Sequence, residues 1–179
     1  MLHASVARHF GGVLREESIA EHWWLAGEVQ HALAATVTAS VLQRQAGLHD
    51  EALASTARAL ERVAGSAERA LLHAVRARIR LEQGDDAGAE TEARRALDET
   101  AAPRDRAEAF MVIASARMQQ GRLDEADEAL SHAAASDPDH EGLCIERARI
   151  AQLQGRSPTR WPTSNSAARN CAAGLPGQN

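Results

Sequence analysis

The chain has 179 residues, of which 44% are hydrophobic but only 3% aromatic, and its formal net charge is −5 at pH 7. This length allows one domain with a hydrophobic core, built here mostly from alanine, leucine and valine. The negative charge argues against a nonspecific surface for nucleic acid or acidic membranes.

Several kinds of chemical site are excluded by residue type and spacing. All 20 basic residues are arginine, so no phosphate-loop lysine, Schiff base or Ser–Lys dyad is available. Cys144 and Cys171 match no zinc or redox spacing, and no two of the eight histidines stand three or four residues apart, as a helical metal site requires. We therefore predict no metal, no cofactor and no enzymatic activity.

The sequence predicts neither a membrane span nor a signal peptide. No apolar run approaches the ~20 residues that span a bilayer, and the first residues lack the cationic and then apolar profile of a signal peptide. We therefore expect a cytoplasmic protein that does not bind membranes.

Residues 1–28 are irregular compared with the repeats in the rest of the chain. We predict a short amphipathic helix over Leu2–Phe10 and a second helix that Ser18 caps and that ends near Gly27. This second helix contains Trp23 and Trp24. One interpretation is a small-molecule effector-binding module around these two residues. The other is that both rings only supply packing between helices.

From Val29 onwards the sequence repeats. Gly47, Gly84 and Gly121 recur every 37 residues, each between two helical segments, and such a period is typical of stacked-repeat solenoids. Two antiparallel helices approach to ~8 Å only where the crossing point carries little side chain. Small residues recur at three fixed distances from each glycine, and we predict them at the helix contacts: Ser40, Ala77 and Ala114; Ala52, Ala89 and Ala126; Ala59, Ala96 and Ala133.

The repeat array is predicted to span residues 29–155. Its hairpins occupy residues 29–64, 67–100 and 104–136, and a lone closing helix comes after them at 141–154. Apolar residues of this closing helix spread more widely than one buried stripe needs, so we also consider a homodimer through it. Residues 156–179 contain three prolines and no acidic residue, and we predict a disordered tail there.

The spacing of small residues resembles the tetratricopeptide repeat, a helix–turn–helix unit of ~34 residues. The match is clearest over residues 107–138, which end in Pro138. This resemblance implies an all-α fold, a right-handed superhelix of helical hairpins. The family's two large aromatic residues are absent, and Arg80 and Arg117 stand at the first of these positions. We therefore expect thinner packing than in a consensus array.

The resemblance also implies a binding site. In tetratricopeptide arrays the first helix of each hairpin lines a concave groove, which here would be an apolar trough with three arginines. Such a groove fits an amphipathic or extended peptide that carries an acidic group. The alternative is that neighbouring chain merely covers it. The predicted partner-binding residues are Val37, Val41, Arg44, Leu71, Arg78, Met111, Met118 and Arg149.

A second resemblance concerns the stretch that opens the array. The residues Ala20, His22, Trp23, Ala26, Gly27 and Ala32 resemble the helical region of large bacterial LuxR-type, ATP-binding transcriptional regulators. This implies that the chain is the sensor or interaction part of such a regulator. We therefore predict a noncatalytic scaffold that binds a protein or peptide and does not itself bind nucleic acid.

Overall fold

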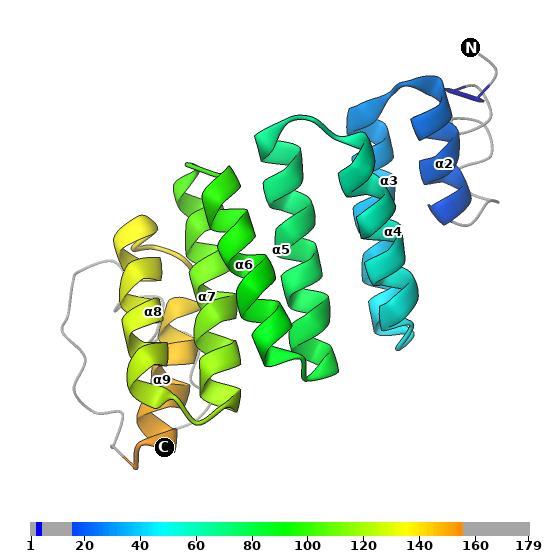
Figure 1. Ribbon diagram of the computed structural model, residues 1–179. Coiled ribbons are helices and arrows are strands. Elements are labelled where there is room, and N and C mark those ends of the chain that lie inside the picture. Colours follow the sequence, from blue (N-terminus) through cyan, green and yellow to red (C-terminus); the bar gives the residue numbers. More distant parts are fainter. Residues whose placement is uncertain (1–2, 5–15, 156–179) are drawn as a thin grey trace, which may run out of the picture.

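The computed structural model describes residues 3–4 and 16–155. This part of the chain contains no β-strand, and residues 16–155 form a succession of helices (Figure 1). Their order is α2 (Glu16–Ala26), α3 (Val29–Gln45), α4 (His49–Arg62), α5 (Ser66–Gln83), α6 (Asp86–Glu99), α7 (Pro103–Gln119), α8 (Leu123–Ser136) and α9 (Leu143–Leu153).

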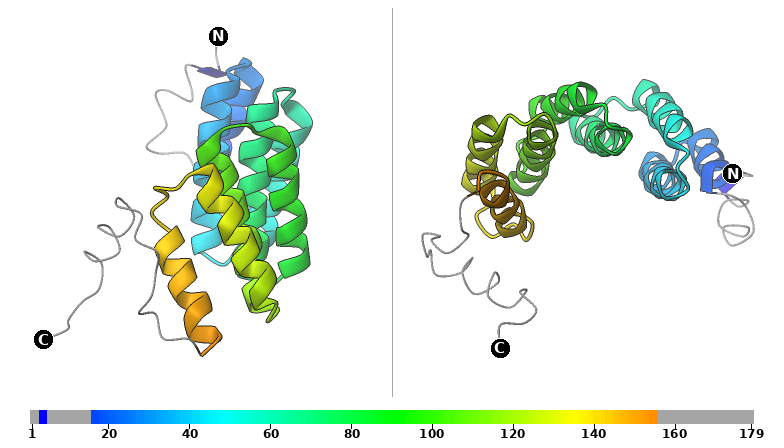
Figure 2. Two further views of the ribbon diagram at one scale, coloured as in Figure 1. Left: turned by 90° about the vertical axis from the view of Figure 1, so that its left-hand side faces the viewer. Right: turned by 90° about the horizontal axis from the view of Figure 1, so that it is seen from below.

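The helices form a curved, two-layered array. Helices α3 and α4, α5 and α6, and α7 and α8 make three successive hairpins, and α9 packs against α8 and α7. Figure 2 shows the array from below as an arc, with α4, α6 and α8 on its convex side. The first helices of the hairpins, α3, α5 and α7, lie on the concave side with α9. The fold is an all-α, tetratricopeptide-like solenoid.

Glycine makes the sharp turn inside each hairpin. Gly47, Gly84 and Gly121 adopt φ values of 77°, 78° and 75°, in the left-handed region that favours glycine at the end of a helix. After Gly84, the side chain of Asp85 accepts a hydrogen bond from the backbone N–H of Gly88 at 3.0 Å and so caps α6. The 37-residue spacing of these glycines therefore fixes where each second helix begins.

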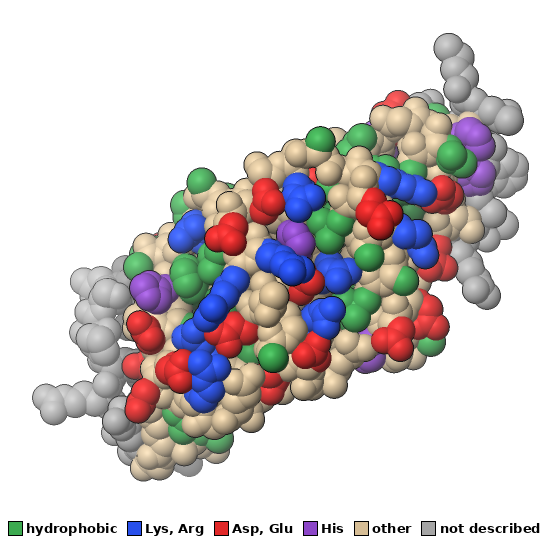
Figure 3. Space-filling view, viewed as in Figure 1, with side chains coloured by type: hydrophobic (Ala, Val, Ile, Leu, Met, Phe, Trp, Pro, Cys, Tyr) green, Lys and Arg blue, Asp and Glu red, His purple; other side chains and the backbone are tan. Residues whose placement is uncertain are grey.

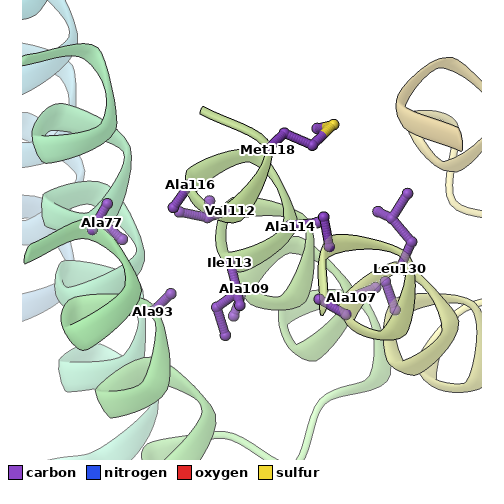
Figure 4. Packing of buried hydrophobic residues seen from close by; sticks show 14 of the residues in the cluster. Ala77, Ala93, Ala107, Ala109, Val112, Ile113, Ala114, Ala116, Met118 and Leu130 are labelled. Atoms are coloured by element: carbon purple, nitrogen blue, oxygen red, sulfur yellow. The ribbon is translucent and has the colours of Figure 1, made fainter. Parts of the chain in front are cut away.

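The nine small residues predicted at the helix contacts are all buried. Each is at most 2% exposed, as expected for small residues at which helices pack closely. The largest core cluster extends over α5 to α9 and consists mainly of alanine (Figure 4). Leu72, Ile79 and Leu130 are the largest apolar side chains that are fully buried. The array is thus held together by close backbone approach rather than by bulky side chains.

The tryptophans pack in the first part of the array. Trp23 is buried in a cluster with Ile19 and Ala20 of α2 and with α3, and its ring stacks on that of His31, with centroids 4.6 Å apart. Trp24 is half-buried and packs against this cluster and against the next one, which contains Leu33. The pair therefore joins α2 to the first hairpin.

The helix ends lie close to the sequence-based expectations. From α3 onwards, both ends of each hairpin and of α9 lie within two residues of the predicted bounds. The prediction that Ser18 caps α2 is wrong, because α2 already includes Glu16 and Glu17. Most of the predicted helix Leu2–Phe10 and the predicted tail lie outside the described residues. The division into leading helices, array and tail stays a prediction.

Helix α9 exposes part of its apolar surface. Leu143 and Ile150 are buried against the array, whereas Ile145 and Leu153 are among the most exposed large apolar side chains of the described residues. The predicted homodimer through this helix stays a prediction. Over residues 3–4 and 16–155, no helix has the length and hydropathy that crossing a membrane requires.

Candidate functional site

The concave face carries a row of apolar side chains at one repeated position. Val37 of α3, Ala74 of α5 and Met111 of α7 are spaced by 37 residues, and each is half-buried. Ile145 of α9 continues the row and is exposed. Since each side chain comes from the first helix of its unit, the four together form an apolar spine along the inner side of the arc.

The predicted groove residues differ in their accessibility. Val41 is half-buried, and Leu71 is 45% exposed. The side chain of Met111 packs on the backbone of Gly142, where an added Cβ would clash with the Met111 methyl group. Met118 is buried in the alanine-rich core. The inclusion of Met118 in the groove is therefore wrong, because its side chain fills space between helices instead of facing solvent.

The three groove arginines all meet carboxylates of the chain itself. Arg44 of α3 pairs with Glu82 of α5, and Arg78 of α5 pairs with Glu108 of α7 at 3.0 Å. His140 Nε2 also lies 3.1 Å from Glu108 Oε1. Arg149 is exposed and lies 3.9 Å from Glu146 on its own helix. The inner side of the array is therefore bridged by ion pairs, and the sequence analysis did not identify the acidic partners of its arginines.

Helix α6 carries two buried carboxylates that the sequence analysis missed. Glu92 is 3% exposed, and its carboxylate lies 2.7 Å from His73 Nδ1 and 3.3 Å from Arg76 Nε, both on α5. Arg95 of α6 lies 3.3 Å from it as well, and Arg80 lies 4.0 Å away. Burial by itself raises the pKa of Glu92, but the hydrogen bond to His73 and the charge of Arg76 outweigh it, so the pKa is lowered.

Glu90 makes a second buried cluster on the opposite side of α6. Its carboxylate accepts hydrogen bonds from Arg117 of α7 at 2.8 and 3.2 Å and from Arg94 at 2.7 Å. Arg122 reaches it at 3.3 Å from the turn before α8. Burial opposes ionisation here too, but these arginines, Arg117 above all, keep the pKa of Glu90 below its ordinary value.

The two clusters explain the missing aromatic residues. Arg80 and Arg117 stand where the repeat family has its first large aromatic residue. Arg117 pairs with the buried Glu90, whereas Arg80 pairs with Asp85 and lies 4.0 Å from the buried Glu92. The expectation of thinner packing therefore misses that ion pairs replace the rings. Arginine twice at a core position was the signal in the sequence, since a buried guanidinium needs an acidic partner.

Arginines and carboxylates alternate over the convex face. Figure 3 shows blue and red side chains interspersed with small green patches over α4, α6 and α8.

Over residues 3–4 and 16–155, no group of three or more histidine, cysteine or acidic residues is arranged to hold a metal ion. We see no arrangement of nucleophile and base in the two clusters, whose acids are all held by arginine or histidine.

The structure leaves little room for an effector beside the tryptophans. A cavity of about 30 Å³ lies between α2, α3 and α4, with Trp24 in its wall. Arg62 crosses it, pairing with Glu21 at 2.8 Å and lying over the Trp24 ring at 5.7 Å. Such a volume holds about one or two waters, whereas ligand sites measure ~300–1,000 Å³. This arrangement favours the packing role of Trp23 and Trp24.

Comparison with known proteins supports the fold at the level of architecture. No protein-family model matches the sequence, and no curated protein matches it. A solved structure of "MamA RS-1 ArsTM double mutant", a tetratricopeptide-repeat protein, is similar with a TM-score of 0.61 and 14% sequence identity. The similarity covers 96% of this chain and 89% of that chain. At this identity it is the helical fold that the two proteins share.

Proposed function

We propose that this protein is a noncatalytic scaffold that binds a segment of another protein on its concave face. The observation that carries the proposal is the apolar spine of Val37, Ala74, Met111 and Ile145, which successive first helices present on the same side. A solenoid turns such a repeated position into an extended binding surface, and apolar positions at regular intervals suit an amphipathic helix or an extended segment.

The charges beside the spine favour a partner segment that carries an acidic residue. Arg78 is 53% exposed and pairs with the half-exposed carboxylate of Glu108. Exposed pairs of this kind contribute only ~0–1 kcal/mol, so a carboxylate of the partner can replace Glu108 at little cost. Leu71 precedes Arg78 by two helical turns and remains open to an apolar contact.

The proposed role as the sensor or interaction part of a bacterial transcriptional regulator rests on the sequence resemblance of the segment around Ala20–Ala32. It predicts that the partner belongs to a regulatory assembly. Binding of a peptide to the concave face does not depend on this role.

The test is a selection of peptides from a displayed library of random 12-residue segments on the immobilised protein. We expect selected peptides to combine apolar residues at regular spacing with at least one acid, and to lose binding to Leu71→Asp and Arg78→Glu. Leu48→Asp is the matched control, because Leu48 is 46% exposed but lies in the turn before α4. Peptides that bind Leu71→Asp as well as Leu48→Asp would refute the concave assignment, as would the failure to select any.

A further inference from the structure

The convex side of the array repeats one arrangement three times, in which a first helix lies between the helices that precede and follow it. Crevices lie over α3, between α2 and α4, and over α7, between α6 and α8. The equivalent crevice over α5 would lie between α4 and α6. A shift of 37 residues relates the side chains that line one crevice to those of the next. Comparing the crevices therefore shows how different residues at the same repeat position fill this space or leave it open.

The crevice over α5 is filled by charged side chains. His73 and Arg76 rise from its floor, and Glu92 and Arg95 enter from α6, so that the buried Glu92 cluster occupies the space. The crevice over α3 is reduced to about 30 Å³ by Arg62, Glu21 and Trp24.

The crevice over α7 is open. At the positions of His73, Arg76, Glu92 and Arg95 it has Phe110, Ile113, Ala129 and His132. Without the ionic cluster, a cavity of about 240 Å³ remains. Phe110 and His132 stack at its wall, with ring centroids 5.2 Å apart. Leu97 and Ala129 add to the apolar lining, and Arg94, Arg117 and Glu128 complete it.

We propose that this convex crevice binds one large apolar side chain of a partner protein, with an acidic residue beside it in the partner's sequence. The volume decides the size of the occupant. A cavity of ~150 Å³ holds a benzene molecule, and drug-sized ligands need ~300–1,000 Å³. A single phenylalanine, leucine or methionine side chain fits between these limits. The site goes beyond the concave function, because it lies on the other side of the array.

The charges at the rim select an acidic neighbour. The Arg94 guanidinium is 62% exposed and contacts one carboxylate oxygen, that of Glu90. With five N–H donors, it keeps donors for a carboxylate of the partner. Glu90 is shared among Arg94, Arg117 and Arg122, and Glu128 is the acidic residue of the lining. Residues 156–179 of the chain itself have three arginines and no acid, so their charge does not complement this rim.

The direct test uses short peptides and two-dimensional amide NMR spectra of the whole protein. The probes are acetyl-Asp-Phe-Asp-amide, acetyl-Asn-Phe-Asn-amide and acetyl-Lys-Phe-Lys-amide. We expect the acidic peptide to bind with a dissociation constant on the order of 1 mM, since one side chain is buried, and to shift the amides of Leu97, Phe110, Ile113 and Ala129. The asparagine peptide should bind about two- to fivefold more weakly than the acidic peptide, as expected for the loss of one exposed ion pair.

The repeat provides a variant that closes the crevice. Ile113→Arg with Ala129→Glu places at α7 and α8 the residues that fill the crevice over α5. This double variant should keep its helical content and lose the peptide shifts. If it does not fold, Ala129→Met reduces the same space with an apolar side chain and serves in its place.

A matched pair of arginines tests the rim. Arg94→Gln should lower the affinity for the acidic peptide about two- to fivefold and leave the affinity for the asparagine peptide unchanged. Arg95→Gln is the control, because Arg95 is the next residue and is 58% exposed but faces the crevice over α5. The proposal is overturned if no peptide shifts these amides, if the closed variant still binds, or if the lysine peptide binds best. Leu71→Asp, which should lose binding on the concave face, should still bind the short peptides in the convex crevice. The failure of one proposal can therefore be distinguished from the failure of the other.

Discussion

Removing the charge of Glu92 should destabilise the protein strongly. Glu92 is 3% exposed and is the common partner of His73 and Arg76, which come from the facing helix α5 and are themselves largely buried. Glu92→Gln keeps nearly the same shape but leaves these cationic or polar groups without their acid. Breaking a buried ion pair from one side costs ~3–5 kcal/mol.

The expected loss of unfolding free energy is about 3 kcal/mol, at the low end of that range because Arg76 also donates to the backbone carbonyl of Leu53 at 2.9 Å. For a chain of this size, each kcal/mol lowers the melting temperature by ~2–4 °C, so Glu92→Gln should melt about 6–12 °C lower. The measurement is urea and thermal unfolding followed by circular dichroism at 222 nm.

The control is Glu125→Gln, which removes an exposed ion pair with Arg122 and should leave stability unchanged within the precision of the measurement. A double-mutant cycle with His73→Gln isolates the contact, and we expect a coupling of at least ~1 kcal/mol. If Glu92→Gln loses less than ~0.5 kcal/mol, the carboxylate does not hold α5 and α6 together and the reasoning fails.

Three further predictions rest on the same contacts and on the exposed face of α9. Because the pKa of Glu92 is depressed below its ordinary value of 4.5, the stability that Glu92 contributes is present above that pH and is lost as pH falls through the folded-state pKa. The free energy of unfolding in urea, measured between about pH 3 and 6, should therefore fall less steeply with decreasing pH in Glu92→Gln than in the wild type. Ala89→Leu should cost about 1–3 kcal/mol by overfilling a helix crossing, whereas Ala87→Leu, on the exposed side of α6, should cost almost nothing in the same unfolding assay. We also expect analytical ultracentrifugation to show a dimer that Ile145→Asp dissociates, since Ile145 is the most exposed large apolar side chain of α9; a monomeric wild type would refute the dimer.

The sequence was sufficient for the architecture because backbone turns and small residues act locally. Gly47, Gly84 and Gly121 each fix a turn through their own φ angle. An alanine such as Ala89 fixes a helix crossing whatever its neighbours are. Fixed spacing therefore carried over directly into three dimensions, and the helix ends could be placed from it.

The site was harder to predict because it depends on pairs of side chains from different helices. The groove arginines were recognised, but not their partners: Glu82 is 38 residues from Arg44, and Glu108 is 30 residues from Arg78. Glu90 and Glu92 look like ordinary exposed residues of a charged helix until α5 and α7 are placed on either side of α6. Met118 was misplaced because its repeat position alone does not show that its side chain packs into the alanine-rich core.

The Glu92 cluster also favours the packing of α6 on α5 over its packing on another first helix. If α6 packed where α8 belongs, on the first helix α7, Glu92 would take the place of Ala129 and meet Phe110 and Ile113 instead of His73 and Arg76. Glu92 would keep Arg95 of its own helix but lose both partners on the facing helix. Burying a carboxylate without its main partners is costly, so the Glu92 cluster disfavours repeats that pair out of order or between two chains. The variant Arg76→Ile with Glu92→Ala gives both sites the same residues at these two positions. It should lose that selectivity, with a larger fraction of domain-swapped oligomers after refolding from urea, measured by size-exclusion chromatography. Arg44→Gln with Glu82→Gln removes an ion pair between α3 and α5 on the concave side, and it should refold as the wild type does. Equal oligomer fractions in the two variants would mean that the cluster contributes to stability alone and does not select the order of the repeats.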